Sequence, residues 1–331
     1  MSIGISPAPG QTAAGQRKKV LVIQYSQTGQ LTQLSAQIIA PLLADSSITV
    51  HIEALAPLKP FPFPWSFFTF FDAFPESAHL IAPALAPLTL NGDENFDLVI
   101  LPYSVWFLAP SQPVTAFLKH PTAVRLLNGK PVITVIACRN MWLLAQEKLK
   151  ALLGAADARL IDNVVLTDPG PTLATFITTP RWMFSGNKAG FWGMPAAGLN
   201  AGQLRGARRF GLAIRDGLHR DQERTGQPLL RGLGAVHVDP RLYISEQAGT
   251  RSFFVWGKLL RAAGPPGSWQ RTPLLVLYVA FLFGMIVTVV PTSLALQALL
   301  RVFTGGWLAK IKTQFEQPSG SSTERNHFYD E

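Results

Sequence analysis

Residues 18–44, KKVLVIQYSQTGQLTQLSAQIIAPLLA, decide the fold of this chain. They begin with a continuous apolar run, which predicts a buried strand at 19–24, and end with the apolar spacing of a helix at 30–44. Hydroxyls, amides and one glycine stand between the two. Such residues at the start of a helix either cap it or hold an anion against its unsatisfied N–H groups. A strand that passes into a helix in this way opens an α/β unit.

The chain repeats this alternation as far as residue 218. Further strands are predicted at 47–55, 96–104, 130–138 and 158–166, and further helices at 111–120, 142–154 and 201–218. Continuous apolar strands that alternate with helices indicate a parallel sheet covered on both faces. The predicted fold class is therefore doubly wound α/β, with five parallel strands.

The cysteine and histidine content limits the kinds of site. The single cysteine, Cys138, excludes an intramolecular disulfide framework and a thiolate zinc site, and the six histidines are scattered. No metal site is predicted.

The basic charge of the chain is concentrated in one region. The net charge is +9, and residues 200–271 hold twelve Lys and Arg against five Asp and Glu, which leaves +7 there. This excess fits either a solvated helix face or attraction to an anionic membrane surface. A nucleic-acid partner is not predicted, because no nucleic-acid motif accompanies the charge.

An apolar run follows this basic region. No residue of 272–300 is charged, and TPLLVLYVAFLFGMIVTVVP at 272–291 has the length needed to cross about 30 Å of hydrocarbon. A membrane-embedded helix is predicted at 272–303 in preference to a buried core helix. Pro291 either ends the span or kinks a tilted or re-entrant helix. Flanking charge slightly favours the cytoplasmic face of the inner membrane for the main domain.

Two long segments interrupt the alternation. In the first, at 57–95, seven phenylalanines and one tryptophan fall between Phe61 and Phe74. That density predicts contact with the core, with lipid or with an apolar ligand. The second, at 166–198, is expected to be a long functional loop. In it Arg181 and Trp182 are candidates for the substrate side, or they only anchor the loop.

The predicted organisation has five parts. They are a flexible tail at 1–16, an α/β domain at 17–225, a basic membrane-proximal segment at 226–271, the membrane helix at 272–303 and a polar tail at 304–331.

The ligand of a doubly wound sheet lies outside the carboxyl ends of the strands. Three loops are expected to meet there, at 25–35, at 101–120 and at 137–142. The first has neither the Gly-Lys-Ser/Thr of a Walker loop nor the three glycines of the dinucleotide fingerprint.

The spacing Ser-x-Thr-Gly-x-x-Thr after the first strand resembles the phosphate loop of the flavodoxin family, and LPYSVWFLAPSQPVTAFLKH at 101–120 resembles a flavin-contacting segment of its reductases. The resemblance implies the strand order 2-1-3-4-5 and bound FMN. It places the phosphate on Ser26, Gln27, Thr28, Gly29, Gln30, Leu31 and Thr32. It places the flavin ring along Tyr103, Ser104, Val105, Trp106 and Phe107, bordered by Cys138, Arg139, Asn140, Met141 and Trp142.

A narrower resemblance covers about residues 20–200. The segments 101–121, 132–150 and 162–187 are similar to the dialkylresorcinol condensing enzymes. That resemblance implies a flavoprotein that works beside a ketosynthase or carrier protein and aromatises a dialkyl-cyclohexanedione to a dialkylresorcinol.

Three functions are weighed on this basis. The first is a membrane-anchored FMN-dependent oxidoreductase acting on a lipidic or quinone-like substrate, with NAD(P)H as a candidate reductant and membrane lipid as a partner. Flavin N5 would carry out that chemistry, so no catalytic side chain is named. The second is a membrane-anchored electron carrier or NAD(P)H:quinone reductase. A low-potential shuttle is disfavoured, because Arg139 would raise the flavin potential. The third is an interaction or assembly protein without flavin.

Overall fold

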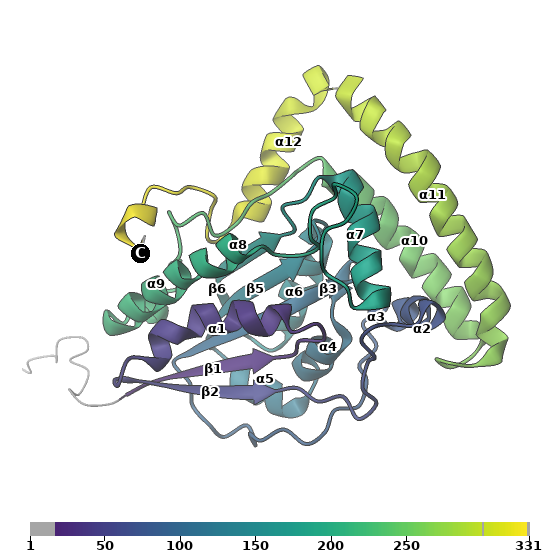
Figure 1. Cartoon of the computed structure of the whole chain (residues 1–331). Coiled ribbons are helices and arrows are strands. Elements are labelled where there is room, and N and C mark those ends of the chain that lie inside the picture. Colours follow the sequence, from purple (N-terminus) through teal and green to yellow (C-terminus); the bar gives the residue numbers. More distant parts are fainter. Residues whose placement is uncertain (1–16, 300, 330–331) are drawn as a thin grey trace, which may run out of the picture.

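The computed structural model describes residues 17–299 and 301–329 of the chain (Figure 1). The tail predicted at 1–16 lies outside the described residues. So do residue 300 of the predicted membrane helix and residues 330–331 of the predicted polar tail.

The centre of the molecule is a parallel sheet. Its five strands are β1 (Lys18–Gln24), β2 (Ile48–Ala54), β3 (Leu98–Trp106), β5 (Pro131–Cys138) and β6 (Arg159–Thr167). They lie in the order β2-β1-β3-β5-β6. The predicted fold class and strand order are confirmed, since this is the flavodoxin-like order 2-1-3-4-5. A two-residue strand that was not predicted, β4 (Ala109–Pro110), pairs antiparallel with the end of β3.

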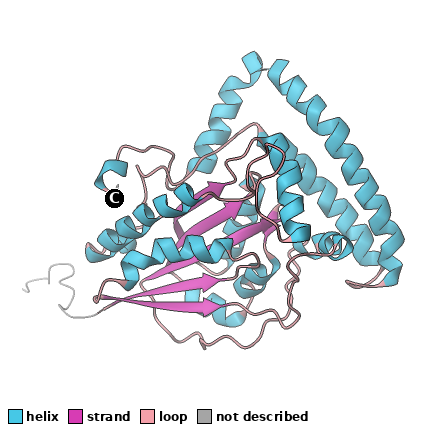
Figure 2. Ribbon diagram, in the orientation of Figure 1, coloured by secondary structure: helices cyan, strands magenta, loops and turns pink. Residues whose placement is uncertain are grey.

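Helices cover both faces of the sheet (Figure 2). One face carries α1 (Gln30–Leu43), α8 (Ala201–Gly206) and α9 (Arg208–His219), and the other carries α4 (Gln112–Leu118), α5 (Pro121–Leu127) and α6 (Leu143–Ala155). The single helix predicted at 201–218 is therefore two helices that meet at Ala207. Helix α1 packs close to α9, because a Cβ on Gly211 of α9 would lie 2.0 Å from the carbonyl oxygen of Ile38 in α1.

The aromatic segment folds into two short helices, α2 (Phe67–Asp72) and α3 (Phe74–Ala78). With α10 (Leu242–Ala263) and α11 (Thr272–Leu299) they form a second apolar core, which contains Phe71, Phe74, Leu260, Leu275 and Tyr278. The Phe74 and Tyr278 rings stack at 4.1 Å. Phenylalanines of this segment therefore pack between α2, α3, α10 and α11.

The segment at 166–198 is predicted to be one long loop, but it contains helix α7 (Thr172–Ser185). Pro171 precedes the helix, and Gly186 ends it in the left-handed conformation at φ +72°. These two residues are start and stop signals that a Gly- and Pro-rich composition conceals.

The last helix returns to the domain. This is α12 (Arg301–Glu316), and its Ile311 and Phe315 are buried in the main core with residues of the sheet. Leu229, Leu230 and Leu233 belong to the same core. The core therefore includes residues that follow residue 225, where the predicted α/β domain ends.

One helix in the described part of the chain is long and apolar enough to cross a membrane. It comprises Trp269–Thr288, with a mean hydropathy of 1.8 and 22% of its residues buried. Arg271 lies near the start of this span and is not an exposed cation, because its guanidinium is buried and donates to Glu76 at 2.6 Å and to Asp72 at 3.3 Å.

Candidate functional site

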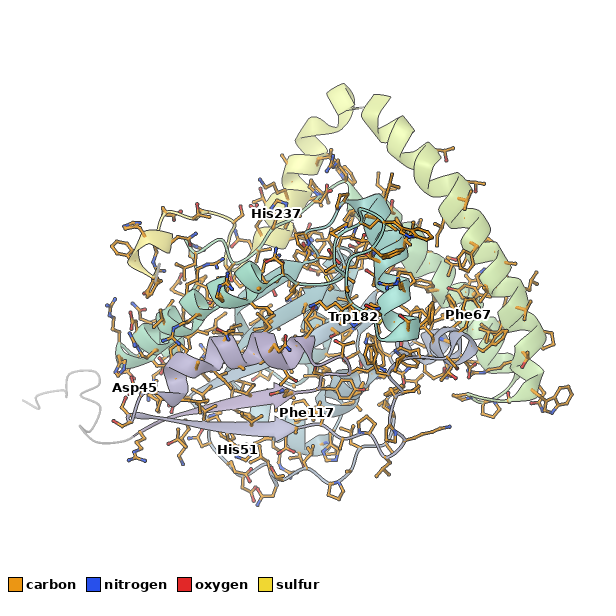
Figure 3. All side chains as sticks on the ribbon, viewed as in Figure 1. Asp45, His51, Phe67, Phe117, Trp182 and His237 are labelled. Carbon is orange, nitrogen blue, oxygen red and sulfur yellow. The ribbon has the colours of Figure 1, made fainter. Side chains whose placement is uncertain are left out.

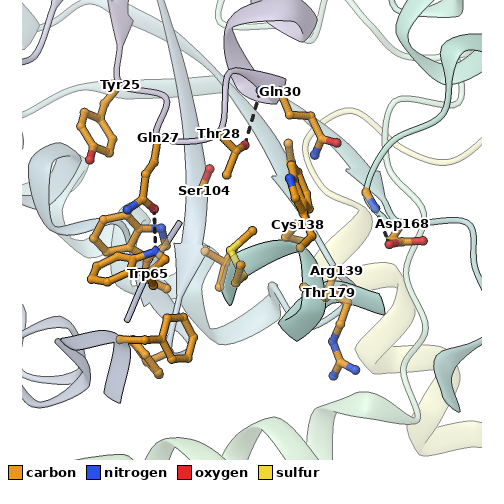
Figure 4. A pocket seen from close by; sticks show the side chains of 18 residues that line it. Tyr25, Gln27, Thr28, Gln30, Trp65, Ser104, Cys138, Arg139, Asp168 and Thr179 are labelled. Atoms are coloured by element: carbon orange, nitrogen blue, oxygen red, sulfur yellow. Dashed lines mark hydrogen bonds between the residues drawn. The ribbon is translucent and has the colours of Figure 1, made fainter. Parts of the chain in front are cut away.

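A pocket of about 220 Å³ opens at the carboxyl ends of β1, β3 and β5. Figure 4 shows its side chains around one space, with Gln27 and Trp65 joined on one side and Asp168 on the other. Its walls come from the three strand ends, from α2 and from α7. The lining residues are Tyr25, Gln27, Thr28, Gln30, Trp65, Phe70, Ser104, Val105, Trp106, Phe107, Ala137, Cys138, Arg139, Asp168, Thr179, Trp182, Met183 and Gly198.

One end of the pocket is the turn between β1 and α1. Gly29 is the N-cap of α1 at φ +78°, and no side chain caps the helix. A Cβ on Gly29 would meet nothing within 4 Å. The Thr28 hydroxyl accepts from the Gln30 amide at 3.4 Å, and the buried Ser26 Oγ has no hydrogen-bond partner in the described part of the chain. The turn therefore offers hydroxyls and a helix N-terminus to an anion.

An aromatic wall forms the other end. The Trp106 ring meets the edges of Phe61 at 4.9 Å and Trp65 at 5.8 Å. The indole N–H of Trp65 donates to Gln27 Oε1 at 3.1 Å, and Gln27 Nε2 donates to the Pro62 carbonyl at 2.6 Å. Gln27 therefore ties the aromatic segment to the β1–α1 turn. A planar ring ligand could stack or pack edge-on within such a wall.

Two polar side chains hold the segment after α7 over the pocket. Gln30 Oε1 accepts from the Leu199 amide at 2.8 Å, and Asp168 Oδ2 accepts from the Gly198 amide at 2.6 Å. Gly198 has φ +77°, and a Cβ there would lie 2.3 Å from Gln30 Oε1. Only glycine fits this close approach without strain.

Arg139 brings a positive charge to the pocket. Its guanidinium lies 4.0 Å from the centre of the Phe176 ring and donates to Thr175 Oγ1 at 3.4 Å. Burial lowers its pKa, while nearby Cys138 and Asp168 act to raise it. Burial raises the pKa of the Cys138 thiol, although Arg139 lowers it. Because the thiolate is the reactive form, Cys138 lines the pocket as a thiol and is no activated nucleophile.

A buried carboxyl lies under the third loop. Glu246 of α10 accepts from the amides of Leu143 at 3.2 Å and Leu144 at 2.8 Å, at the start of α6. Burial raises the pKa of Glu246 to about 7, against the opposing effect of those amide hydrogen bonds. It joins α10 to the helix that follows Cys138, and no local sequence pattern marks it as a buried group.

The structure brings ten of the predicted site residues together around the pocket: Gln27, Thr28, Gln30, Ser104, Val105, Trp106, Phe107, Cys138, Arg139 and Trp182. Trp182 lies on the pocket side of α7 near the end of the sheet (Figure 3).

The other predicted residues lie outside the lining. Tyr103 is fully buried and donates to Gln146 at 2.7 Å. Trp142 is buried against Phe315. Arg181 donates to the Ala189 carbonyl at 2.7 Å and so anchors a loop. The remainder are Ser26, Gly29, Leu31, Thr32, Asn140 and Met141.

Eight lining residues were not named from the sequence: Tyr25, Trp65, Phe70, Ala137, Asp168, Thr179, Met183 and Gly198. All but Tyr25 and Ala137 belong to the two long segments at 57–95 and 166–198. The segments carried a signal in their composition, but no local pattern marked which of their side chains face inward.

Comparison with known proteins gives only distant similarity. No protein-family model matches the chain, and no curated protein matches its sequence. A flavoprotein in complex with FMN from Lactobacillus acidophilus NCFM is 12% identical, with a TM-score of 0.36, over 44% of this chain and 91% of that chain. A protein from Bacteroides eggerthii DSM 20697, provisionally described as a flavoprotein, is 17% identical, with a TM-score of 0.32, over 45% and 87%. At these TM-scores neither neighbour bears on function.

Proposed function

We propose that this chain binds FMN in the pocket and acts at a membrane as an FMN-dependent oxidoreductase on an apolar, quinone-like substrate. The observation that carries the proposal is the pairing of two features in one pocket. The N-terminus of α1 with the Thr28 hydroxyl stands at one end and an aromatic wall at the other, both at the carboxyl edge of a doubly wound sheet.

The β1–α1 turn has the chemistry to hold a phosphate. Ser26 lies in the same turn but outside the pocket lining, and its Oγ is buried without a partner among the described residues. A buried hydroxyl in that state lacks an acceptor or donor that a ligand could supply. The amides at the start of α1 and the Thr28 hydroxyl would complete the cradle. No lysine is needed, since the helix N-terminus itself favours an anion.

The aromatic end suits a flat, largely apolar ring system. Trp106, Val105 and Phe107 would orient the ring from the end of β3, and Trp65 would close the site from the aromatic segment. Bound FMN would supply hydride exchange at its N5 atom. Arg139 would favour negative charge on the bound ring.

The substrate class is inferred from the remaining wall. Phe70, Met183 and Trp182 line the pocket from α2 and α7, so an apolar partner could pack beside the flavin. This cover supports an enzyme over an electron carrier, which needs an exposed flavin edge. Aromatisation of a dialkyl-cyclohexanedione beside a ketosynthase or carrier protein, and reduction by NAD(P)H, rest only on the sequence resemblance.

Purification of the full chain in detergent tests the flavin. We expect yellow protein that releases about one FMN per chain. We also expect reduction by NADPH or dithionite and reoxidation by menadione. A colourless chain that also fails to quench added FMN fluorescence would refute both flavin functions.

A further inference from the structure

Helices α11 and α12 form a hairpin that is attached to the α/β domain at both ends. Figure 1 shows α11 running away from the domain to an apex and α12 running back. At the first end, Leu275 and Tyr278 are buried in the second apolar core. At the other end, Phe315 is buried in the main core and contacts the rings of Trp142 and Tyr243.

The chain after α12 is built into the edge of the sheet. Ser319 is fully buried, and its hydroxyl donates to the Asp162 carboxylate of β6 at 2.7 Å. The same oxygen accepts from the Asn163 amide at 2.7 Å. The Gly234 amide donates to the Ser322 carbonyl at 2.6 Å. These contacts fix the C-terminal segment on the same side of the hairpin as the domain.

The surface of α11 has the character of a lipid-facing helix. No residue of 272–299 is charged, and its exposed side chains include Leu277, Phe283 and Val287 at 57%, 50% and 71%. Thr288 and Thr292 donate their hydroxyls to carbonyl oxygens one turn earlier, so those groups need no water.

The lengths of the two helices do not allow two crossings. The 28 residues of α11 extend about 42 Å, whereas the 16 residues of α12 extend about 24 Å. The hydrocarbon of a bilayer is about 30 Å thick. The last turn of α12 is in the domain core, and the helix carries Arg301, Lys310 and Lys312. If α11 crossed completely, the C-terminal segment could not return to Asp162.

We propose that the α11–α12 hairpin enters an anionic bilayer from one side and does not cross it, so that the domain and the C-terminal segment share one side. The proposal rests on the membrane attachment in the proposed function.

Charge on the neighbouring helix selects a lipid surface over a second copy of the chain. On α10, the exposed cations Arg251, Lys258 and Arg261 alternate with exposed apolar side chains, among them Phe254 and Leu259. This pattern suits anionic headgroups above acyl chains. Two copies that met on this face would bring like charges together.

Single-cysteine labelling of the full chain in sealed membrane vesicles tests the topology. Cys138 is half-buried in the pocket wall, so it is replaced by alanine in every variant and the added thiols report their own surroundings. Leu43→Cys marks the domain, Ser322→Cys marks the C-terminal segment and Val287→Cys marks the hairpin. Leu43 and Val287 are a matched pair, since both are exposed apolar side chains on helices, at 59% and 71%.

We expect a membrane-impermeant maleimide to label Leu43→Cys and Ser322→Cys from the same side of the vesicles. Val287→Cys should react more slowly by about tenfold or more until detergent is added, because lipid excludes the thiolate and the charged reagent. Labelling of Ser322→Cys only from the side opposite to Leu43→Cys would overturn the proposal in favour of a full crossing. Equal labelling of Val287→Cys and Leu43→Cys without detergent would overturn insertion. None of these readouts depends on flavin, so a colourless protein with the expected labelling would refute only the proposed function.

Discussion

Replacement of Ser26 by alanine separates a phosphate cradle from an ordinary helix start. The Ser26 hydroxyl is buried and has no partner in the described chain, so its removal should leave the free energy of unfolding of the apo-protein within about 1 kcal/mol of the original, or raise it. A hydrogen bond to a charged group contributes about 1.5–3 kcal/mol. Loss of that bond to a phosphate should therefore weaken FMN binding by about 10- to 150-fold.

The assay is titration of detergent-solubilised apo-protein with FMN, followed by flavin fluorescence, beside urea denaturation of the same sample. Ser35→Ala is the matched control. Ser35 is a buried serine of the same region, and its hydroxyl donates to the Leu31 carbonyl at 2.8 Å inside α1. We expect its FMN affinity to be unchanged. If Ser26→Ala binds FMN as tightly as Ser35→Ala, the turn is a helix start and not a phosphate site.

Three further predictions concern ionisable groups in the interior. Arg271→Met leaves the Glu76 carboxylate without its bidentate partner and should lower the free energy of unfolding by about 3–5 kcal/mol. Adding Glu76→Gln should recover part of this loss, and thermal unfolding measures both changes. Because the pKa of Glu246 is raised from 4.5 to about 7, the folded state holds more protons than the unfolded state between these values. Stability should then fall by up to about 3 kcal/mol as pH rises from about 4.5 to about 7, and Glu246→Gln should flatten that part of the curve in denaturant titrations at each pH. Cys138 should resist iodoacetamide at pH 8 until denaturant is added, because burial raises its pKa; mass spectrometry that finds rapid native alkylation would contradict this.

Local sequence patterns were sufficient for the sheet and for the position of the pocket. Four strands are short, largely apolar runs and β2 alternates apolar with polar residues, and both patterns can be read without knowledge of distant contacts. The loop at 25–35 follows β1 directly, so chain order alone places it at the carboxyl edge. Local patterns do not show that Trp106 lines the pocket whereas Trp142 is packed against Phe315 of α12. Both are aromatic residues at strand ends, and only the returning helix decides which of them is covered.

The sequence by itself determined the α/β class, the hydroxyl-rich turn and an apolar helix long enough to reach into a membrane. The tertiary structure alone decided how the chain closes around them. Ser319 and Asp162 are 157 positions apart, and as polar residues both look solvent-exposed in a local reading. Their burial becomes favourable only when α12 brings the hydroxyl to the carboxylate, because a buried polar group is stable only with its hydrogen-bond partner in place. The periodicity of apolar residues shows which face of a helix or strand is apolar, whereas the element that covers this face depends on long-range packing.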